Sequence, residues 1–428
     1  MSSTTAEATN TSSSKQTMGR GRRVALIGIT MLVLMSVTRV WSGYDDLTSS
    51  GTVGAALRLT VPILLAGLAG LWAERVGILN IGIEGMMILG TWFGAFGAWK
   101  WGPWVGLVLA VIGGMLGGLI HAVATIRFNI DQVISGVVMN LFAFFGVRYL
   151  SELLFVGQPQ GGISQSPPQS SAIPRIDVPF LSGGPIGSWT TPDIFGWFEE
   201  RHWFLLGDLA GVLKGLTSNL SLASLIAVLL VPISAWVLWR TAFGLRLRSS
   251  GEAPEAAESL GVNVIKVRYI GLLISGGFAG LGGGFLSIVS SSYYRQGQTA
   301  GRGFIGLATM IFGNWRPSGV LGGAAVFGYS EGLKLVAGGS ITGLFLFIAL
   351  VSALVLIITL SAPVMRRLVT TAVIGVLAFL AYLTVDEVPE SLTQSLPYVV
   401  TLVVLATASQ RLRPPARAGV PYRPGGAH

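Results

Sequence analysis

Long apolar stretches separated by short polar segments recur along almost the whole chain. Since about 20 apolar residues form a helix long enough to cross a bilayer, each long stretch predicts a membrane-spanning helix. The predicted helical segments lie near residues 24–40, 53–72, 78–98, 104–125, 132–155, 219–239, 269–290, 303–313, 319–337, 342–360, 368–384 and 396–409. The pattern therefore predicts an all-α polytopic membrane protein with about 10 to 12 transmembrane segments.

One pair of these segments differs from the others. The segment 303–313 is too short to cross a bilayer alone, and Pro317 interrupts the chain before the next apolar stretch at 319–337. Proline ends or kinks a helix because it lacks a backbone N–H, and broken helices in membranes occur where protein or water covers the freed backbone groups. We therefore expect a broken or re-entrant helix at this pair.

Charged residues between the apolar stretches predict the sides on which the loops lie. Basic residues gather in 240–268 and in the tail 411–428, whereas the turns near Asp45 and Glu387 are acidic. Cytoplasmic loops carry the excess of Lys and Arg in membrane proteins. Both termini are therefore expected in the cytoplasm, with 411–428 forming a basic cytoplasmic tail.

The remaining segments complete the expected domain organisation. Residues 1–23 are rich in Ser and Thr and predict a disordered cytoplasmic tail, and the membrane domain covers 24–410. Within that domain, 156–218 is a long Pro-, Ser- and Gly-rich loop on the extracytoplasmic side. Its tryptophans indicate some folded or interface-lying structure. Contact with an extracytoplasmic partner and a tolerated insertion without a specific role are both open for this loop.

The composition agrees with a membrane protein and excludes several kinds of site. Hydrophobic residues make up 51% of the chain and charged residues 11%, against about 25% charged residues in soluble domains. The absence of cysteine excludes disulfides and thiolate metal sites. The three histidines form no cluster in the sequence, so we predict no metal site. The net charge of +9 comes from segments that flank apolar spans, so we expect no nucleic-acid partner.

Polar side chains within the apolar stretches mark a candidate solute path. Asn80 and Glu84 lie four residues apart, so on a helix they would share one face. A charged group at bilayer depth is unfavourable by at least ~2.5 kcal/mol and usually faces a bundle interior or a polar cavity. These two residues are expected either to line the path or, in the case of Glu84, to hold a broken helix in place. Asn140 is a second amide that lines the same path or bridges two helices.

The basic loop 240–268 contains a predicted short helix over 252–260. Pro254 fits the first helical turn, and Gly261 fits a left-handed residue that ends the helix. Ala256 and Ala257 are expected to be exposed, which would let another protein surface approach closely. The chain contains no Gly-Lys pair and hence no Walker A motif. An energy-supplying partner is therefore expected to dock on this helix.

Two separated motifs resemble one family of transport proteins. The stretch ERVGILNIGIEGMM resembles the signature ER-x-G-x-x-NIG-x-EGMM of permease subunits of ABC importers in the branched-chain amino acid and ribose permease superfamily, closest to its nucleoside branch. The matching residues are Glu74, Arg75, Gly77, Asn80, Ile81, Gly82, Glu84, Gly85, Met86 and Met87. The second motif, G-x-x-x-x-AA-x-x-x-G-[IV]-N, is similar to the coupling segment of that superfamily. It is matched by Gly251, Ala256, Ala257, Gly261, Val262 and Asn263, with Glu252 beside the first glycine.

The resemblance implies a division of labour among several chains. Two permease subunits, the same or paralogous, would form the path in a bacterial-type plasma membrane. A separate cytoplasmic ATPase would bind ATP and dock on 252–260, so this chain would be no enzyme and would hold no cofactor. An extracytoplasmic binding protein, commonly a lipoprotein, would deliver a nucleoside.

Two alternatives stay open. The same machine would import a monosaccharide such as ribose, or riboflavin, if the signature is shared beyond nucleoside carriers. An ion-coupled secondary transporter would also explain Glu84 and a broken helix, but it would leave the alanine pair at 256–257 unexplained.

Overall fold

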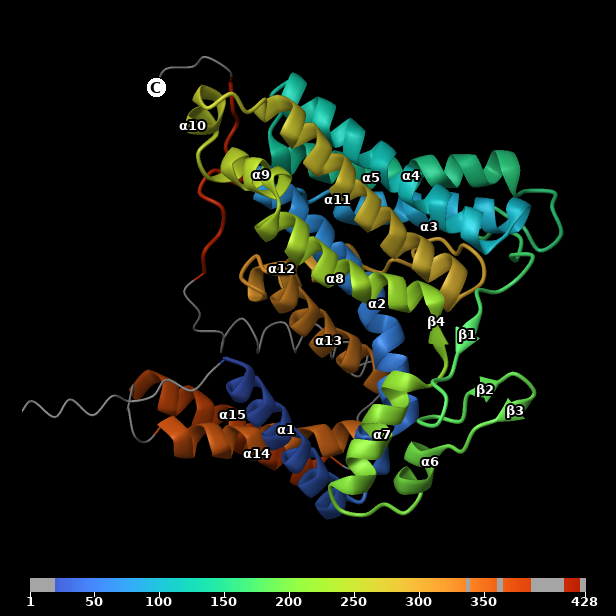
Figure 1. The fold of residues 1–428 in the computed structure, drawn as a ribbon, viewed down its shortest axis with the longest axis vertical. Helices are drawn as coiled ribbons and strands as arrows, with labels where there is room; N and C mark the ends of the chain where they lie inside the picture. The colour runs from blue at the N-terminus through green and yellow to red at the C-terminus, as the bar shows by residue number, and fades with distance from the viewer. Residues whose placement is uncertain (1–19, 336–338, 360–364, 386–411, 424–428) are drawn as a thin grey trace, which may run out of the picture.

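The structure, a computed structural model, describes residues 20–335, 339–359, 365–385 and 412–423 (Figure 1). The described part consists of helices, connecting segments and four two-residue strands. Seven of its helical segments are long and apolar enough to cross a membrane: Ala25–Ser42, Asp45–Arg75, Pro103–Arg127, Gln132–Leu154, Leu222–Arg240, Val264–Ser290 and Thr342–Thr359. The all-α polytopic class is therefore confirmed. The predicted helix at 396–409 and residues 1–19 of the predicted tail lie outside the described residues, and the sidedness of the termini stays a prediction.

The centre of the bundle is formed by four helices that pack against one another. Helix α2 (Ser50–Arg75) contacts α11 (Val264–Phe285), which in turn packs against α3 (Ile83–Trp101) and α4 (Pro103–Ala122). Helices α4 and α11 end in the single π-helical turns η2 (Val123–Arg127) and η3 (Leu286–Ser290).

Glycines bring α4 and α11 unusually close together. A Cβ atom added to Gly114 would lie 2.1 Å from the carbonyl oxygen of Gly276, and one added to Gly280 would lie 2.2 Å from that of Ala110. No larger residue fits such a distance, so the two backbones are in direct contact. This is the close approach that small residues spaced four apart provide in membrane helices.

The other long helices surround this centre and expose apolar side chains outward. Helix α5 packs against α3, and α8 contacts α2 and α13 (Pro317–Leu333), while α14 packs against α1 and α15. Their bounds are α1 (Arg20–Ser42), α5 (Gln132–Leu154), α8 (Leu222–Arg240), α14 (Gly339–Thr359) and α15 (Met365–Thr384). Figure 1 shows α1, α14 and α15 as a group beside the main bundle.

The broken helix is found at the predicted place. Helix α12 (Arg302–Phe312) ends at Gly313, and α13 (Pro317–Leu333) begins at the proline. Asn314 and Trp315 between them have positive φ angles of 52°, a conformation that reverses the chain direction. Both helices pack against α2, so the turn between them is held by protein.

The long loop 156–218 is folded, as its tryptophans indicate. It contains α6 (Ile194–Glu199), α7 (Leu206–Thr217) and the paired strands β2 (Pro185–Ile186) and β3 (Trp189–Thr190). Strand β1 (Arg175–Ile176) pairs with β4 (Leu220–Ser221) just before α8. Helix α7 packs on the first turns of α2, where the short helix η1 (Asp45–Leu47) precedes it. An ion pair of 2.7 Å between Arg39 Nε and the buried Asp208 joins α1 to this loop.

The loop 240–268 contains two helices where one was predicted. Helix α10 (Pro254–Ser259) matches the prediction, with Pro254 in its first turn and Gly261 at φ +81° after its end. Helix α9 (Ala242–Glu252) was not predicted. Since α8 joins β4 to α9, these two helices lie at the opposite end of the bundle from the loop 156–218.

Candidate transport and coupling site

Asn80 lies in a non-helical stretch between α2 and α3. The prediction that Asn80 and Glu84 share one helix face is wrong, because α3 begins only at Ile83. The backbone turns at Gly77, whose φ of +89° is the left-handed conformation that favours glycine. Asn80 is fully buried, and its Nδ2 donates a 3.0 Å hydrogen bond to Ser275 Oγ on α11. Within the described part of the chain, its buried Oδ1 has no hydrogen-bond donor.

Glu84 holds the first turn of the half-helix α12. Its Oε1 accepts a hydrogen bond of 2.9 Å from the Gly301 N–H, and its Oε2 accepts one of 2.7 Å from the Gly303 N–H. A carboxylate at a helix N-terminus satisfies unpaired N–H groups and interacts favourably with the helix dipole. These contacts are those expected of Glu84 if it holds a broken helix, which was one of the two predicted roles.

Asn140 bridges α5 to the start of α3. Its Oδ1 accepts a 2.7 Å hydrogen bond from the Gly85 N–H, and its Nδ2 donates a 3.2 Å hydrogen bond to the Ile81 carbonyl. Gly85 is needed at this crossing, because a Cβ there would lie 2.7 Å from the Met139 carbonyl oxygen. Both ends of the Asn140 amide are thus bonded to the turn at 81–85. Gly82 in the same turn lies against the Met139 side chain.

Glu74 and Arg75 tie the end of α2 to the broken helix. Glu74 Oε2 accepts a 2.6 Å hydrogen bond from the Trp315 indole, and Arg75 Nη2 donates one of 2.6 Å to the Trp315 carbonyl. Trp315 was not among the predicted site residues. Its place directly before Arg316 and Pro317, at the break, was the available signal.

The two motifs, about 170 residues apart in the sequence, meet in space. A Cβ atom on Gly251 would lie 2.4 Å from the Arg75 carbonyl oxygen, so the end of α9 touches the turn after α2 directly. Ser250 Oγ donates a 3.1 Å hydrogen bond to the Val76 carbonyl, and Arg75 Nη1 lies 3.6 Å from Glu252 Oε1. The structure therefore places the turn at 75–77 against residues 250–252. Local patterns in the sequence give no sign of this contact.

The predicted docking helix exposes only part of the expected face. Ala256 is exposed, but Ala257 is 3% exposed and packs inward, so the expectation that both alanines face outward is wrong for Ala257. A helix of six residues turns its successive positions by about 100°, and this rotation separates the two alanines. Leu260, 85% exposed, lies just after α10 and adds an apolar side chain to the free surface.

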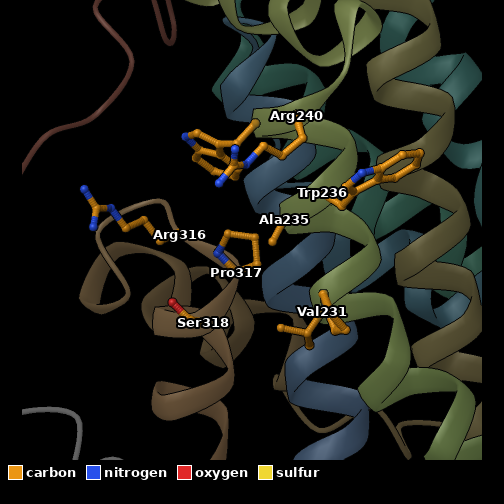
Figure 2. A pocket seen from close by; sticks show the side chains of 9 residues that line it. Val231, Ala235, Trp236, Arg240, Arg316, Pro317 and Ser318 are labelled. Carbon is orange, nitrogen blue, oxygen red and sulfur yellow. The ribbon is translucent and has the colours of Figure 1, made fainter. Parts of the chain in front are cut away.

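A groove of about 690 Å³ lies between α8 and the start of α13 (Figure 2). Arg240 and Arg316 stand on its two sides, and Val231 and Ala235 line its apolar floor along α8. Trp236 and Trp239 complete the α8 wall. Arginines and tryptophans together are typical of a cytoplasmic membrane interface, which agrees with the side predicted for the loop 240–268.

A second, partly buried ion pair was not predicted from the sequence. Arg302 Nη2 lies 2.9 Å from Glu331 Oε2, and this pair joins the first turn of α12 to the last turns of α13. The available signal was Glu331, a carboxylate inside the apolar stretch 319–337. Together with Glu84, this pair fixes α12 at its N-terminus from two sides.

Comparison with known proteins identifies the family. The family model described as "Branched-chain amino acid transport system / permease component" matches residues 52–360. The guanosine ABC transporter permease protein NupQ of Bacillus subtilis is 36% identical over 300 residues, which cover 68% of this chain and 84% of the relative. No solved structure matches the chain.

Two further relatives match over two thirds or more of this chain. The nucleoside ABC transporter permease protein NupC of Lactococcus lactis is 30% identical over 380 residues, covering 86% of this chain and 96% of the relative. The putative glucose ABC transporter permease protein TsgC13 of Haloferax volcanii is 32% identical over 294 residues, covering 67% and 78%. With its matching region extending over most of the bundle, this chain is a membrane-spanning member of the branched-chain amino acid transport system permease family.

Proposed function

We propose that this chain is a permease subunit of an ATP-driven ABC importer for nucleosides in a bacterial-type plasma membrane. The observation that carries the proposal is the contact between the turn at 75–77 and residues 250–252. It connects the loop on which an ATPase would dock to the helix α2 at the centre of the bundle. The names of the relatives from Bacillus subtilis and Lactococcus lactis supply the substrate class.

The proposed division of labour follows from where the exposed surfaces lie. A cytoplasmic ATPase would dock on Ala256 and Leu260, which form a small apolar surface at one end of the bundle. An extracytoplasmic binding protein would approach the opposite end, where Trp189, Trp197 and Trp203 of the loop 156–218 are exposed. A second permease subunit, the same or paralogous, would complete the path.

Asn80 is the residue that we propose for contact with the solute. Its carbonyl oxygen is buried without a donor among the described residues, and an unsatisfied buried acceptor is unfavourable by about 1–3 kcal/mol. A ribose hydroxyl or a base N–H would satisfy it during passage. Glu84 and Asn140, whose polar atoms are already bonded to backbone groups, would instead position the turn that carries Asn80.

The test is uptake by the complete importer in proteoliposomes. The chain is reconstituted with its ATPase, its partner permease and its binding protein, and radiolabelled guanosine uptake is measured with and without ATP. We expect uptake that requires ATP, persists when ionophores remove ion gradients, and falls when unlabelled nucleosides compete. Uptake that ionophores abolish and ATP does not drive would contradict the proposal.

A monosaccharide is the second candidate substrate, favoured by the relative named as a putative glucose permease. Glucose and ribose are therefore added as competitors in the same assay. Inhibition by a sugar but not by any nucleoside would replace the nucleoside assignment and leave the ATP-driven mechanism in place.

A further inference from the structure

The segment 412–423 near the C-terminus lies along the helices of the loop 240–268. Figure 1 shows it as a red trace passing α9 and α10. The family match ends at residue 360, so this segment belongs to the part of the chain that the family model does not cover. We call residues 412–423 the strap.

The first half of the strap is bonded through its backbone. The Arg413 N–H donates a 2.8 Å hydrogen bond to Asn314 Oδ1, in the turn between α12 and α13. The Ala416 N–H donates one of 3.1 Å to Glu252 Oε2, and the Arg417 N–H donates one of 2.9 Å to the Gly251 carbonyl. The strap therefore joins the broken helix to the end of α9.

The second half of the strap follows α10 to the start of α11. Arg417 Nη2 lies 3.6 Å from Glu255 Oε1, and the guanidinium of Arg268 lies 5.2 Å from the centre of the Tyr422 ring. Burial and the neighbouring Glu258 carboxylate raise the pKa of Tyr422 to about 12, so its hydroxyl stays neutral. The strap thus lies beside α10, where Arg417 pairs with Glu255.

Helix α10 has little support without these contacts. It is six residues long, and only Pro254 and Ala257 of it are buried. Helices of this length do not hold their position in water through backbone bonds alone. The strap leaves Ala256 and Leu260 uncovered, so it supports α10 from one side and keeps the proposed docking surface free.

We propose that the strap links α10 to the turn between α12 and α13, so that a displacement of α10 by the ATPase reaches the broken helix. Ala416 and Arg417 are then positioning residues for energy coupling. This proposal rests on the proposed function. It adds that residues outside the family's matched region determine how much transport each ATP hydrolysed produces.

The test removes one strap hydrogen bond in the full chain within the complete importer. Ala416→Pro deletes the N–H that bonds Glu252, whereas Ala416→Ser keeps it and serves as the matched control. We expect Ala416→Pro to lower uptake about tenfold per ATP hydrolysed, since weaker positioning wastes hydrolysis, while ATPase binding and basal hydrolysis stay at the level of Ala416→Ser. An unchanged ratio of uptake to hydrolysis in Ala416→Pro would overturn the proposal.

A second measurement does not depend on transport. The chain has no cysteine, so an Arg417→Cys, Glu255→Cys pair in membranes can be joined by a short bismaleimide without background. Efficient intramolecular cross-linking is expected, and each single variant is the control. Absence of cross-linking would show that the strap does not lie beside α10, and it would overturn the proposal. Efficient cross-linking together with absent ATP-driven uptake in the wild-type importer would contradict the proposed function and leave the strap standing.

Discussion

The turn at 80–85 and helix α10 differ sharply in how they are held. The turn is buried, and Asn140 and Glu84 bond its backbone and that of the neighbouring half-helix. Helix α10 is mostly exposed and depends on contacts from α9 and the strap. The comparison indicates that the turn at 80–85 is held in one geometry, whereas helix α10 is able to move.

The largest effect is expected from Glu84→Gln. The amide would keep one acceptor and turn an NH₂ group toward a backbone N–H, leaving a buried donor unpaired. Loss of charged hydrogen bonds of this kind lowers the free energy of unfolding by about 2 kcal/mol. We expect lower thermal stability in detergent and at least a tenfold loss of uptake.

Glu152→Gln is the control for this experiment, since Glu152 lies exposed near the end of α5. If Glu84→Gln removes uptake while stability and subunit assembly stay unchanged, Glu84 contacts the solute, and its structural role is secondary.

Substitutions of the two alanines of α10 should distinguish an effect on ATPase docking from an effect on folding. Ala256→Arg places a charge on the exposed surface, so we expect normal expression and about tenfold less uptake per ATP hydrolysed. Ala257→Arg forces a charge into a buried position, which is strongly unfavourable, so we expect reduced expression. Expression levels and the ratio of uptake to hydrolysis measure the difference. Equal behaviour of the two variants would mean that the packing of α10 differs from the structure.

Gly251→Ala tests the contact between the two motifs. The added methyl would lie 2.4 Å from the Arg75 carbonyl oxygen, and overpacking of this kind lowers stability by about 1–3 kcal/mol. We expect a several-fold loss of uptake with the ATPase still bound, as judged by co-purification. Gly261→Ala is a useful comparison, because no described atom lies within 4 Å of a Cβ at that position and the strain there is in the backbone alone. Full activity of Gly251→Ala would show that the contact between Gly251 and Arg75 can widen without loss of uptake.

The smallest effect is expected from reversing the ion pair between the strap and α10. The side chains of Arg417 and Glu255 are 41% and 44% exposed, and exposed ion pairs contribute about 0–1 kcal/mol. Arg417→Glu should therefore lower uptake per ATP only about twofold, and Arg417→Glu with Glu255→Arg should restore it. A loss in the single variant that the double variant fails to restore would assign the effect to other contacts of residue 417.

Local signals predicted the elements of this fold better than their contacts. Pro254 and Gly261 act within a few residues, so the bounds of α10 could be predicted, and Pro317 marked the broken helix for the same reason. The non-helical position of Asn80 could not be predicted, because the apolar pattern continues through the turn. The left-handed conformation of Gly77 leaves no trace in the hydrophobic pattern.

The candidate site was predicted by residue type but not by arrangement. Glu84 is conspicuous in an apolar stretch, yet its partners Gly301 and Gly303 lie more than 200 residues away. The contact of Gly251 with Arg75, and that of the strap with α9, likewise depend on packing between distant segments. Such contacts follow from the whole fold, and no periodicity within one segment contains them.

The glycine contact between α4 and α11 has a mechanical consequence. Because the two backbones touch, the helices have no layer of side chains that could slide or re-pack, and they behave as one stiff rod. Together with η3, α11 runs from Val264 to Ser290, a length of about 40 Å at 1.5 Å per residue. Its first turn lies next to α10 and its last turn lies near the opposite end of the bundle. If the end of α11 beside α10 moved in one direction, the other end of α11 would therefore move in the opposite direction. No helix would have to unwind for this motion.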